Sequence, residues 1–584
     1  MSYTAMQRVA REWRVAEQVP GEFLAAHADL PPAVAQLLYQ RGMRSPAAIA
    51  AFLHPDYDTH RHDPCLFRDM AKAVERIVLA RERGERILVH GDYDADGVSG
   101  AAVLTETLTA FGCSADAFIP HREEDGYGFK EPGLARARAL GATVIITCDC
   151  GIANAATVAA AREVGIDVVI TDHHLIPTDA SGAEALPPAF AILHPKARGE
   201  QYPYQELTGG GVALKFCEAI VQHDAQRSDR RLPEGFAKWL LDCAAISTVA
   251  DFGPLTGENR VIVRYGLLVL AKTRRLGLQK LYEIAKIVPE RITPGTIGFQ
   301  IAPRINASGR IDHASVALRL LRTTDAAEAA QLADQINATN GERQQLVLRA
   351  NEEAFAQVGE LGDRRTLVVV GEWWPPGIVG LVASALKERH HRPAIALTTA
   401  GGRVTGSGRS IAGFHIVRAL DAVRGTLAAY GGHPQACGLT LTGVDAIPAF
   451  RDGIEAYARA TLTDADLVPT IAVDAELPLA HATLALAEQL EQLEPFGIGN
   501  PQPRFLARGL TVADVRTMGA TGAHCRIGVQ EDRKKYTLVC FRYADICPNI
   551  AIGNRIDVVY ELDINEWNGR RDAQVKVVDV RETK

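Results

Sequence analysis

Four short apolar runs alternate with helical segments between residues 86 and 171. The runs are RILVH (86–90), ADAFIP (115–120), TVIITC (143–148) and DVVIT (167–171). Apolar strands separated by amphipathic, Ala-rich helices are typical of a parallel sheet that helices cover on both faces. The sequence therefore predicts an α/β fold in which functional side chains gather at the carboxyl ends of the strands.

Acidic residues and histidines follow these runs directly. They are Asp92, Asp94 and Asp96 in HGDYDADGVSG (90–100), then Asp149, then Asp172, His173 and His174, and later Asp251 after a further apolar run. Carboxylates mixed with imidazoles suit Mn²⁺, or Mg²⁺ with more retained water. The set is large enough for two cations about 3.5–4 Å apart, the arrangement that serves displacement at phosphorus. The pattern predicts a two-cation centre for phosphodiester chemistry.

The same aspartate stretch also matches the opening of a calcium-binding EF-hand loop. With Asp92 as loop position 1, an EF-hand needs a bidentate Glu at position 12, where this chain has Val103. A strand, rather than a helix, is also predicted before the loop. An EF-hand is therefore excluded. A solvated acidic turn would explain this motif alone, but not the later clusters.

The chain has 584 residues, which is too long for one hydrophobic core and predicts several domains. Short β-type runs near the end of the chain favour an OB-fold barrel. We expect a helical N-terminal lead-in (1–75), a catalytic α/β domain (76–325), a connecting helix (326–360), a second α/β domain (361–460) and the barrel (466–584).

The composition bears on the compartment of the protein and on the partners that it can bind. Ten cysteines without a CxxC pair argue against a disulfide framework and against a structural zinc site, and favour reduced thiols in a cytoplasmic protein. The first residues lack the apolar core of a signal peptide, and no apolar stretch reaches the roughly 18 residues of a membrane span, so we expect no membrane partner. The net charge of -7 does not exclude nucleic-acid binding, because a local basic groove matters more than the sum.

The predicted barrel carries such a local basic segment. The run EDRKKYTLVCFRY (531–543) mixes cationic and aromatic side chains, which single-strand platforms use for backbone contact and base stacking. We expect Lys534, Lys535, Tyr536 and Arg542 to contact nucleic acid, and Phe541 to fill the barrel core.

Taken in order, the motifs resemble the DHH phosphoesterase superfamily. DYDADG, Asp149, the DHH triplet 172–174 and Asp251 are similar to its motifs I to IV, and GGHPQACGLTL (431–441) is similar to its DHHA1 companion domain. Three further segments resemble the RecJ family of single-strand-specific exonucleases: PRINASGRI (303–311), GSGRSIAGFHI (406–416) and LEPFGIGNPQPRF (493–505). Pro375 departs from the family, which often carries a polar residue there, and this puts a minor DNA contact in doubt.

The resemblance implies a role for individual residues. His90, Asp94 and Asp149 would hold one cation, and Asp96, Asp149, His173 and Asp251 the other, with Asp92 as an uncertain ligand and Asp172 as a peripheral or orienting group. The groups implied to face the scissile phosphate are His174, Arg304, Arg409 and His433. The further DNA contacts implied in the two α/β domains are Arg310, Ser407, Gly431 and Gly432.

The resemblance also implies a function. It is that of an Mn²⁺- or Mg²⁺-dependent exonuclease with a two-metal mechanism, which degrades single-stranded DNA from the 5′ end to mononucleotides in recombination and repair. Single-strand-binding protein and other repair proteins would be partners. Two alternatives stay open: a DHH-family phosphodiesterase acting on short oligoribonucleotides or cyclic dinucleotides, and a non-catalytic DNA-binding replication scaffold. The barrel extension disfavours the first, and the filled ligand positions disfavour the second.

Overall fold

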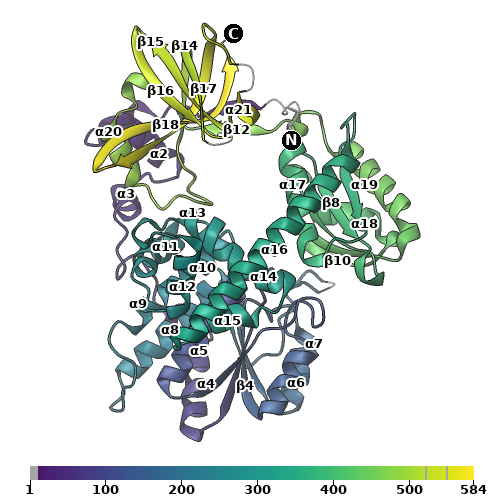
Figure 1. The fold of residues 1–584 in the computed structure, drawn as a ribbon. Helices are drawn as coiled ribbons and strands as arrows, with labels where there is room; N and C mark the ends of the chain where they lie inside the picture. The colour runs from purple at the N-terminus through teal and green to yellow at the C-terminus, as the bar shows by residue number, and fades with distance from the viewer. Residues whose placement is uncertain (1–10, 180, 520–521, 548–549, 584) are drawn as a thin grey trace.

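The computed structural model describes residues 11–179, 181–519, 522–547 and 550–583. The first ten residues of the predicted lead-in lie outside these ranges. Figure 1 shows a first α/β unit at the bottom, a second α/β unit on the right, and a β-barrel at the top. The long helix α16 (Ala326–Val358) runs from the first unit to the second. The predicted fold class is confirmed.

The first unit is built on a five-stranded parallel sheet with the strand order β3-β2-β4-β5-β6. The strands are β2 (Arg86–Gly91), β3 (Ser114–Phe118), β4 (Ala142–Cys148), β5 (Asp167–Thr171) and β6 (Ala191–Leu193). The four predicted strands are confirmed. Strand β6 was not predicted, because its three residues are too few to form a recognisable pattern.

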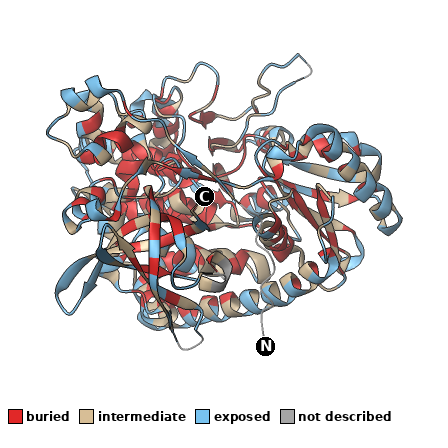
Figure 2. Ribbon diagram, turned by 90° about the horizontal axis from the view of Figure 1, so that it is seen from above, coloured by how far each residue is buried: buried red, intermediate tan, exposed pale blue. Residues whose placement is uncertain are grey.

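Helices cover both faces of this sheet because successive strand residues point to opposite sides. Val89 and Ile146 pack in the cluster with α4 (Met70–Arg83), α5 (Ala95–Phe111) and α8 (Gly209–Ala225). Leu88 and Ile145 pack in the opposite cluster, with α6 (Glu131–Leu140) and α7 (Ala155–Glu163). Figure 2 shows the resulting pattern of buried strands and exposed outer helix faces.

Helices complete the first unit and lead to α16. They are α9 (Phe236–Trp239), α10 (Leu241–Ala250), α11 (Gly257–Ala271), α12 (Leu276–Ala285), α13 (Pro294–Thr296), a π-helical turn (Ile297–Ile301), α14 (Ala302–Ile311) and α15 (Ser315–Arg322). Asp325 begins α16 by accepting a hydrogen bond from the amide of Glu328. The helix continues without a break through Gly341.

The second unit contains a mixed sheet with the order β10-β11-β9-β8-β7. Its strands are β7 (Leu367–Gly371), β8 (Ala394–Thr398), β9 (Thr405–Arg409), β10 (Leu427–His433) and β11 (Ala436–Leu441). Its helices are α17 (Pro376–His390), α18 (Ile416–Ala422) and α19 (Ile447–Thr461). The Gly-Gly-His motif therefore lies at the end of β10, beside the turn into β11.

Five strands close the C-terminal barrel, and β14 pairs with both β15 and β17. These strands are β14 (Arg504–Met518), β15 (His524–Glu531), β16 (Lys534–Cys540), β17 (Arg555–Trp567) and β18 (Arg570–Glu582). The short strand β13 (Ala475–Glu476) joins β14, and α20 (Leu484–Glu491) and α21 (Tyr543–Ile546) complete the domain. Closure removes the free sheet edges.

The N-terminal segment packs against the barrel, far away in the sequence. It contains α1 (Gly21–Ala26), α2 (Pro32–Gln40) and α3 (Pro46–Leu53), of which α2 and α3 share the barrel's hydrophobic core. It also contains a strand, β1 (Glu12–Val15), which the helical prediction did not include and which pairs with β12 (Thr470–Val473). Among the described helices, none has the length and apolar character that a membrane crossing requires.

Candidate metal centre

The predicted ligands converge at the carboxyl edge of the first sheet. Asp92, Asp94 and Asp96 follow β2, Asp149 follows β4, and the DHH triplet follows β5. Asp251 caps the carboxyl end of α10. Asp149 has a φ of 61°, a left-handed conformation that is rare for a residue with a side chain. Strained backbone of this kind is concentrated at functional sites, where the surrounding structure enforces it.

Glycines allow the chain to turn from β2 into α5 behind the aspartates. A Cβ on Gly97 would lie 2.4 Å from the amide nitrogen of Asp92, and one on Gly100 would lie 2.2 Å from the sulfur of Cys148. The turn is also fixed by Asp94, whose Oδ1 accepts hydrogen bonds from the amides of Asp96 and Gly97. The close packing holds the three aspartates at the start of a helix, where negative charge is favoured.

Three overlapping groups of donor atoms form at this edge. One consists of Asp96, His173 and Asp251, another of Asp92, Asp94 and Asp149, and a third of Asp149, His173 and His174; within each group the candidate atoms lie within 4.8 Å of one another. Nε2 of His173 lies 3.0 Å from Oδ1 of Asp149, which links the first two groups. Such convergence of carboxylate and imidazole donors is what a pair of divalent cations requires.

Asp92 and His90 lie in different surroundings. Asp92 lies with Asp94 and Asp149, and its buried Oδ1 has no hydrogen-bond partner among the described residues. His90 shares the face of Leu88, and its Nδ1 lies 3.6 Å from the sulfur of Cys150. Within the described part of the chain, no such donor group includes His90. Asp92 therefore fits the first cation better, while the ligand role of His90 stays a prediction.

The electrostatics of the centre favour bound cations. Burial, and then repulsion from Asp96, raises the pKa of Asp251 to about 8. Burial and neighbouring carboxylates also raise the pKa of Asp92, Asp94 and Asp149. Divalent cations prefer hard oxygen donors. Bound cations would offset the repulsion between these buried carboxylates and would pair the unpaired carboxylate oxygen of Asp92. The residues present therefore fit Mn²⁺ or Mg²⁺.

Asp96 is held by groups that were not predicted from the sequence. The amides of Gly209 and Gly210 donate to Oδ2 and Oδ1 of Asp96 at 2.8 and 2.6 Å, and the hydroxyl of Ser247 donates to Oδ1 at 2.6 Å. The two amides belong to the first turn of α8, where unpaired N–H groups and the helix dipole attract an anion. The signal in the sequence was the unusual TGGG run at 208–211.

His174 is oriented by Asp172. Nδ1 of His174 donates to Oδ1 of Asp172 at 2.8 Å. Burial alone would lower the pKa of His174, but this hydrogen bond and the charge of Asp172 outweigh it and raise the pKa to about 9. The hydroxyl of Tyr127, which was not predicted, lies 3.0 Å from Nε2 of His174. His174 is therefore a cationic group at the rim of the carboxylate cluster.

Comparison with known proteins identifies the family. The DHH family N-terminal domain matches residues 86–248, the DHHA1 domain matches 363–460, and the RecJ OB domain matches 473–579. The single-stranded-DNA-specific exonuclease RecJ of Escherichia coli is 32% identical over 571 residues, which cover 95% of this chain and 96% of that protein. The chain belongs to the RecJ family.

Two further RecJ proteins support this assignment. RecJ of Bacillus subtilis is 38% identical over 553 residues, covering 94% of this chain and 68% of the relative. The crystal structure of Thermus thermophilus RecJ in complex with Mn²⁺ is 29% identical and superimposes with a TM-score of 0.82, over 98% of this chain and 80% of the other. The same RecJ in complex with Mg²⁺ gives a TM-score of 0.76.

The second α/β unit of this RecJ-family chain carries several of the predicted phosphate-binding residues. Arg409 on β9 donates to the hydroxyl of Ser407 at 2.8 Å. His433 ends β10, and its pKa is lowered by burial and then by the charges of His174 and Lys196. A Cβ on Gly432 would lie 2.3 Å from the carbonyl oxygen of Ala436, whereas Gly431 faces open space.

The two predicted arginines of α14 have protein partners. Nε of Arg304 donates to Oδ1 of Asn337 at 3.1 Å. Arg310 donates to the carbonyl oxygen of Gly377 at 3.0 Å and so joins α14 to α17. Burial, followed by the charges of Arg122 and Arg343, lowers the pKa of Arg310 to about 9. Arg122 and Arg343 were not predicted as site residues. DNA contact by Arg304 and Arg310 remains a prediction.

The predicted DNA-contacting residues of the barrel differ in how far they are exposed. Lys534, Lys535 and Arg542 are exposed, whereas Tyr536 is partly buried against the barrel core. The prediction that Phe541 fills the core is wrong, because this side chain is 45% exposed. It follows the last residue of β16, so strand alternation no longer directs it inward, and its ring packs against His524. Outside the barrel, Pro375, the residue at which the chain departs from the family pattern, directly precedes the first residue of α17.

Proposed function

We propose that this protein is a divalent-metal-dependent exonuclease that degrades single-stranded DNA. The observation that carries the proposal is the contact between His173 and Asp149, which joins two three-residue donor groups at the carboxyl edge of the first sheet. Family membership supports it, since the curated relatives bear the name of single-stranded-DNA-specific exonuclease and match across all three domains.

The donor groups indicate which residues hold the cations. One cation would be held by Asp92, Asp94 and Asp149, and the second by Asp96, Asp149, His173 and Asp251. When bound, the cations would lower the pKa of a coordinated water and neutralise charge on the phosphate oxygens. His90 is a further candidate, because burial lowers the pKa of its imidazole to about 4 and keeps the ring neutral.

The protein's own cations act on the phosphate. His174, protonated through its hydrogen bond to Asp172, presents a positive charge beside the carboxylate cluster. Arg409 on β9 and His433 at the end of β10 would contact the phosphate from the second α/β unit. Preorganised donors of this kind stabilise the negative charge that develops on the non-bridging oxygens in the transition state.

Several finer features belong to the same proposal. Digestion proceeds from the 5′ end to mononucleotides, in recombination and repair, and the protein is cytoplasmic. Lys534, Lys535, Tyr536 and Arg542 contact the strand outside the centre, and single-strand-binding protein or other repair proteins are partners. The exposed cations of the barrel support strand binding, since backbone contact and base stacking are the usual means of holding single strands.

The test compares end-labelled DNA as a free single strand and as a blunt duplex, with Mn²⁺ or Mg²⁺ added. We expect digestion of the single strand only, stopped by chelation and lost in Asp94→Ala and His173→Ala. Asp179→Ala, which changes an exposed loop, is the matched control and should retain activity. Equal digestion of the duplex, or full activity in both centre variants, would refute the proposal. A 3′ label released first would refute the polarity alone.

A further inference from the structure

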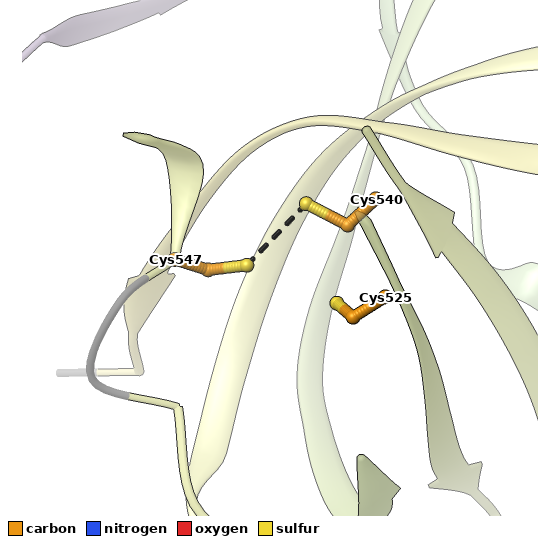
Figure 3. A group of neighbouring side chains, drawn as sticks. All are labelled: Cys525, Cys540 and Cys547. Atoms are coloured by element: carbon orange, nitrogen blue, oxygen red, sulfur yellow. Dashed lines mark hydrogen bonds between the residues drawn. The ribbon is translucent and has the colours of Figure 1, made fainter. Parts of the chain in front are cut away.

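Three cysteines converge inside the C-terminal barrel, far from the carboxylate centre. They are Cys525 on β15, Cys540 at the end of β16, and Cys547 directly after α21. Figure 3 shows their sulfur atoms pointing toward one another from three separate segments. All three sulfur atoms lie within 4.8 Å of one another, and those of Cys540 and Cys547 are 3.4 Å apart.

The fold explains why the three meet. The antiparallel pairing of β15 with β16 sets Cys525 directly opposite Cys540. After β16 the chain reverses at Arg542, whose φ is 52°, and the short helix α21 returns Cys547 to the same place. The three cysteines are 0%, 0% and 4% exposed. Within the described ranges, this is the one such donor group outside the carboxylate centre, and the one made of thiols.

The geometry suits one thiophilic cation. Zinc–sulfur bonds of about 2.3 Å place neighbouring tetrahedral or trigonal ligands about 3.8–4.0 Å apart. The observed separations, from 3.4 Å to no more than 4.8 Å, bracket that spacing. Thiolates select soft or borderline cations such as Zn²⁺ and Cu⁺, whereas Mn²⁺ and Mg²⁺ prefer the oxygen donors of the other centre. The two sites would therefore take different metals.

We propose that Cys525, Cys540 and Cys547 form a buried three-thiolate site for a thiophilic cation, Zn²⁺ or Cu⁺. The cation would tie the end of β16 and the helix α21 to β15. Arg542 lies between two of the ligands, and its amide donates to Nδ1 of His524 at 3.1 Å, so the cation would also fix the position of this exposed arginine. The site does not depend on the proposed exonuclease activity.

A disulfide is the main competing explanation. Thiol–disulfide exchange proceeds through a thiolate that an oxidant or a second thiol can reach. The three side chains are buried, so an oxidant or a second thiol reaches them poorly. A cation that binds them would displace their protons.

The experiment uses the full-length protein, with metal content measured by mass spectrometry and Co²⁺ as a spectroscopic probe. We expect close to one equivalent of zinc or copper per chain, and a thiolate-to-cobalt charge-transfer band when Co²⁺ replaces it. Oxygen and nitrogen ligands of the carboxylate centre do not produce that band. Cys547→Ser should lose the band and the equivalent of metal. Cys437→Ser, a buried cysteine of the second α/β unit, is the matched control and should keep both.

The wild-type protein alone can overturn the proposal, whether or not a variant folds. Absence of the charge-transfer band in the wild-type protein would refute the site, as would a band that Cys547→Ser leaves unchanged. A mass lower by two hydrogen atoms without reductant, restored by reductant, would show a disulfide instead. Zinc and copper content measured in the same sample distinguishes the two cations.

Discussion

The hydroxyl of Ser247 donates a hydrogen bond of 2.6 Å to Oδ1 of Asp96. Ser247 in turn lies 2.7 Å from the hydroxyl of Thr208, at the start of α8. Groups behind a ligand set its orientation, and their loss typically costs about 10- to 100-fold in metal affinity. We therefore expect Ser247→Ala to weaken Mn²⁺ binding roughly 10-fold while the protein stays folded, as measured by calorimetric titration.

Ser99 provides the control for this substitution. It is a buried serine of α5 whose hydroxyl has no hydrogen-bond partner among the described residues. Ser99→Ala should leave Mn²⁺ affinity nearly unchanged. Equal losses of affinity in the two variants would mean that Ser247 does not act through Asp96.

The second prediction concerns the glycine run at the start of α8. A Cβ on Gly209 would lie 2.6 Å from the Cβ of Asp149, and one on Gly210 would lie 2.5 Å from the Ser247 hydroxyl. On Gly211 the nearest atom would be 3.4 Å away, an ordinary contact. We expect Gly209→Ala to lower the hydrolysis rate at saturating Mn²⁺ by roughly 100-fold or more, because it displaces a ligand of both cations. Gly211→Ala should retain the wild-type rate, and a rate as low as that of Gly209→Ala would contradict the steric argument.

The third prediction concerns Arg260, which joins the first α/β unit to the barrel domain. It is 2% exposed and donates to the carbonyl oxygens of Phe52, Leu493 and Glu494. Arg260→Ala leaves buried acceptors without donors, so the free energy of unfolding should fall by about 3 kcal/mol or more in urea denaturation. Arg264→Ala, which removes one long contact of 3.4 Å from a half-buried side chain, should change the free energy of unfolding by less than about 1 kcal/mol. Similar losses in both variants would contradict this role.

His390 gives a pH prediction away from the metal centre. Burial, followed by the charges of Arg389, Arg392 and Arg364, lowers the pKa of His390 from 6.5 to about 4. Between these pH values the unfolded chain binds a proton that the folded protein does not, so stability falls as the pH decreases through this range. We expect the urea midpoint of the wild-type protein to fall more between pH 7 and pH 5 than that of His390→Gln. The exposed His481→Gln should behave like the wild type, and parallel curves for His390→Gln and wild type would exclude the effect.

Much of the centre could be predicted from the sequence because parallel strands deliver their carboxyl ends to one edge. Asp96, Asp149, His173 and Asp251 meet there as expected. The order of strands and helices alone could not show whether His90 or Asp92 is a ligand of the first cation. His90 still obeys strand alternation and shares the face of Leu88, where its ring lies beside Gly133 of α6. Only the turn after β2 directs the following residues to the centre.

The contacts that the sequence could not reveal join positions far apart in the chain. Asp96 and the amide of Gly209 are 113 residues apart. The donor is a backbone N–H group, so the residue type at that position does not indicate it. Strand β1 forms only because β12 supplies its partner, so four isolated residues could not indicate it. Phe541 lies just beyond a strand, where alternation no longer decides which side chains are buried.

The most direct test of the proposed centre counts Mn²⁺ ions and measures hydrolysis in the same samples. Free Mn²⁺ is quantified by electron paramagnetic resonance for the wild-type protein and for Asp149→Asn, and single-strand digestion is followed in parallel. The proposed centre predicts two bound ions per wild-type chain. In Asp149→Asn at least one ion should be lost, and hydrolysis should be slower by roughly 100-fold or more. Two tightly bound ions and an undiminished rate in Asp149→Asn would contradict it.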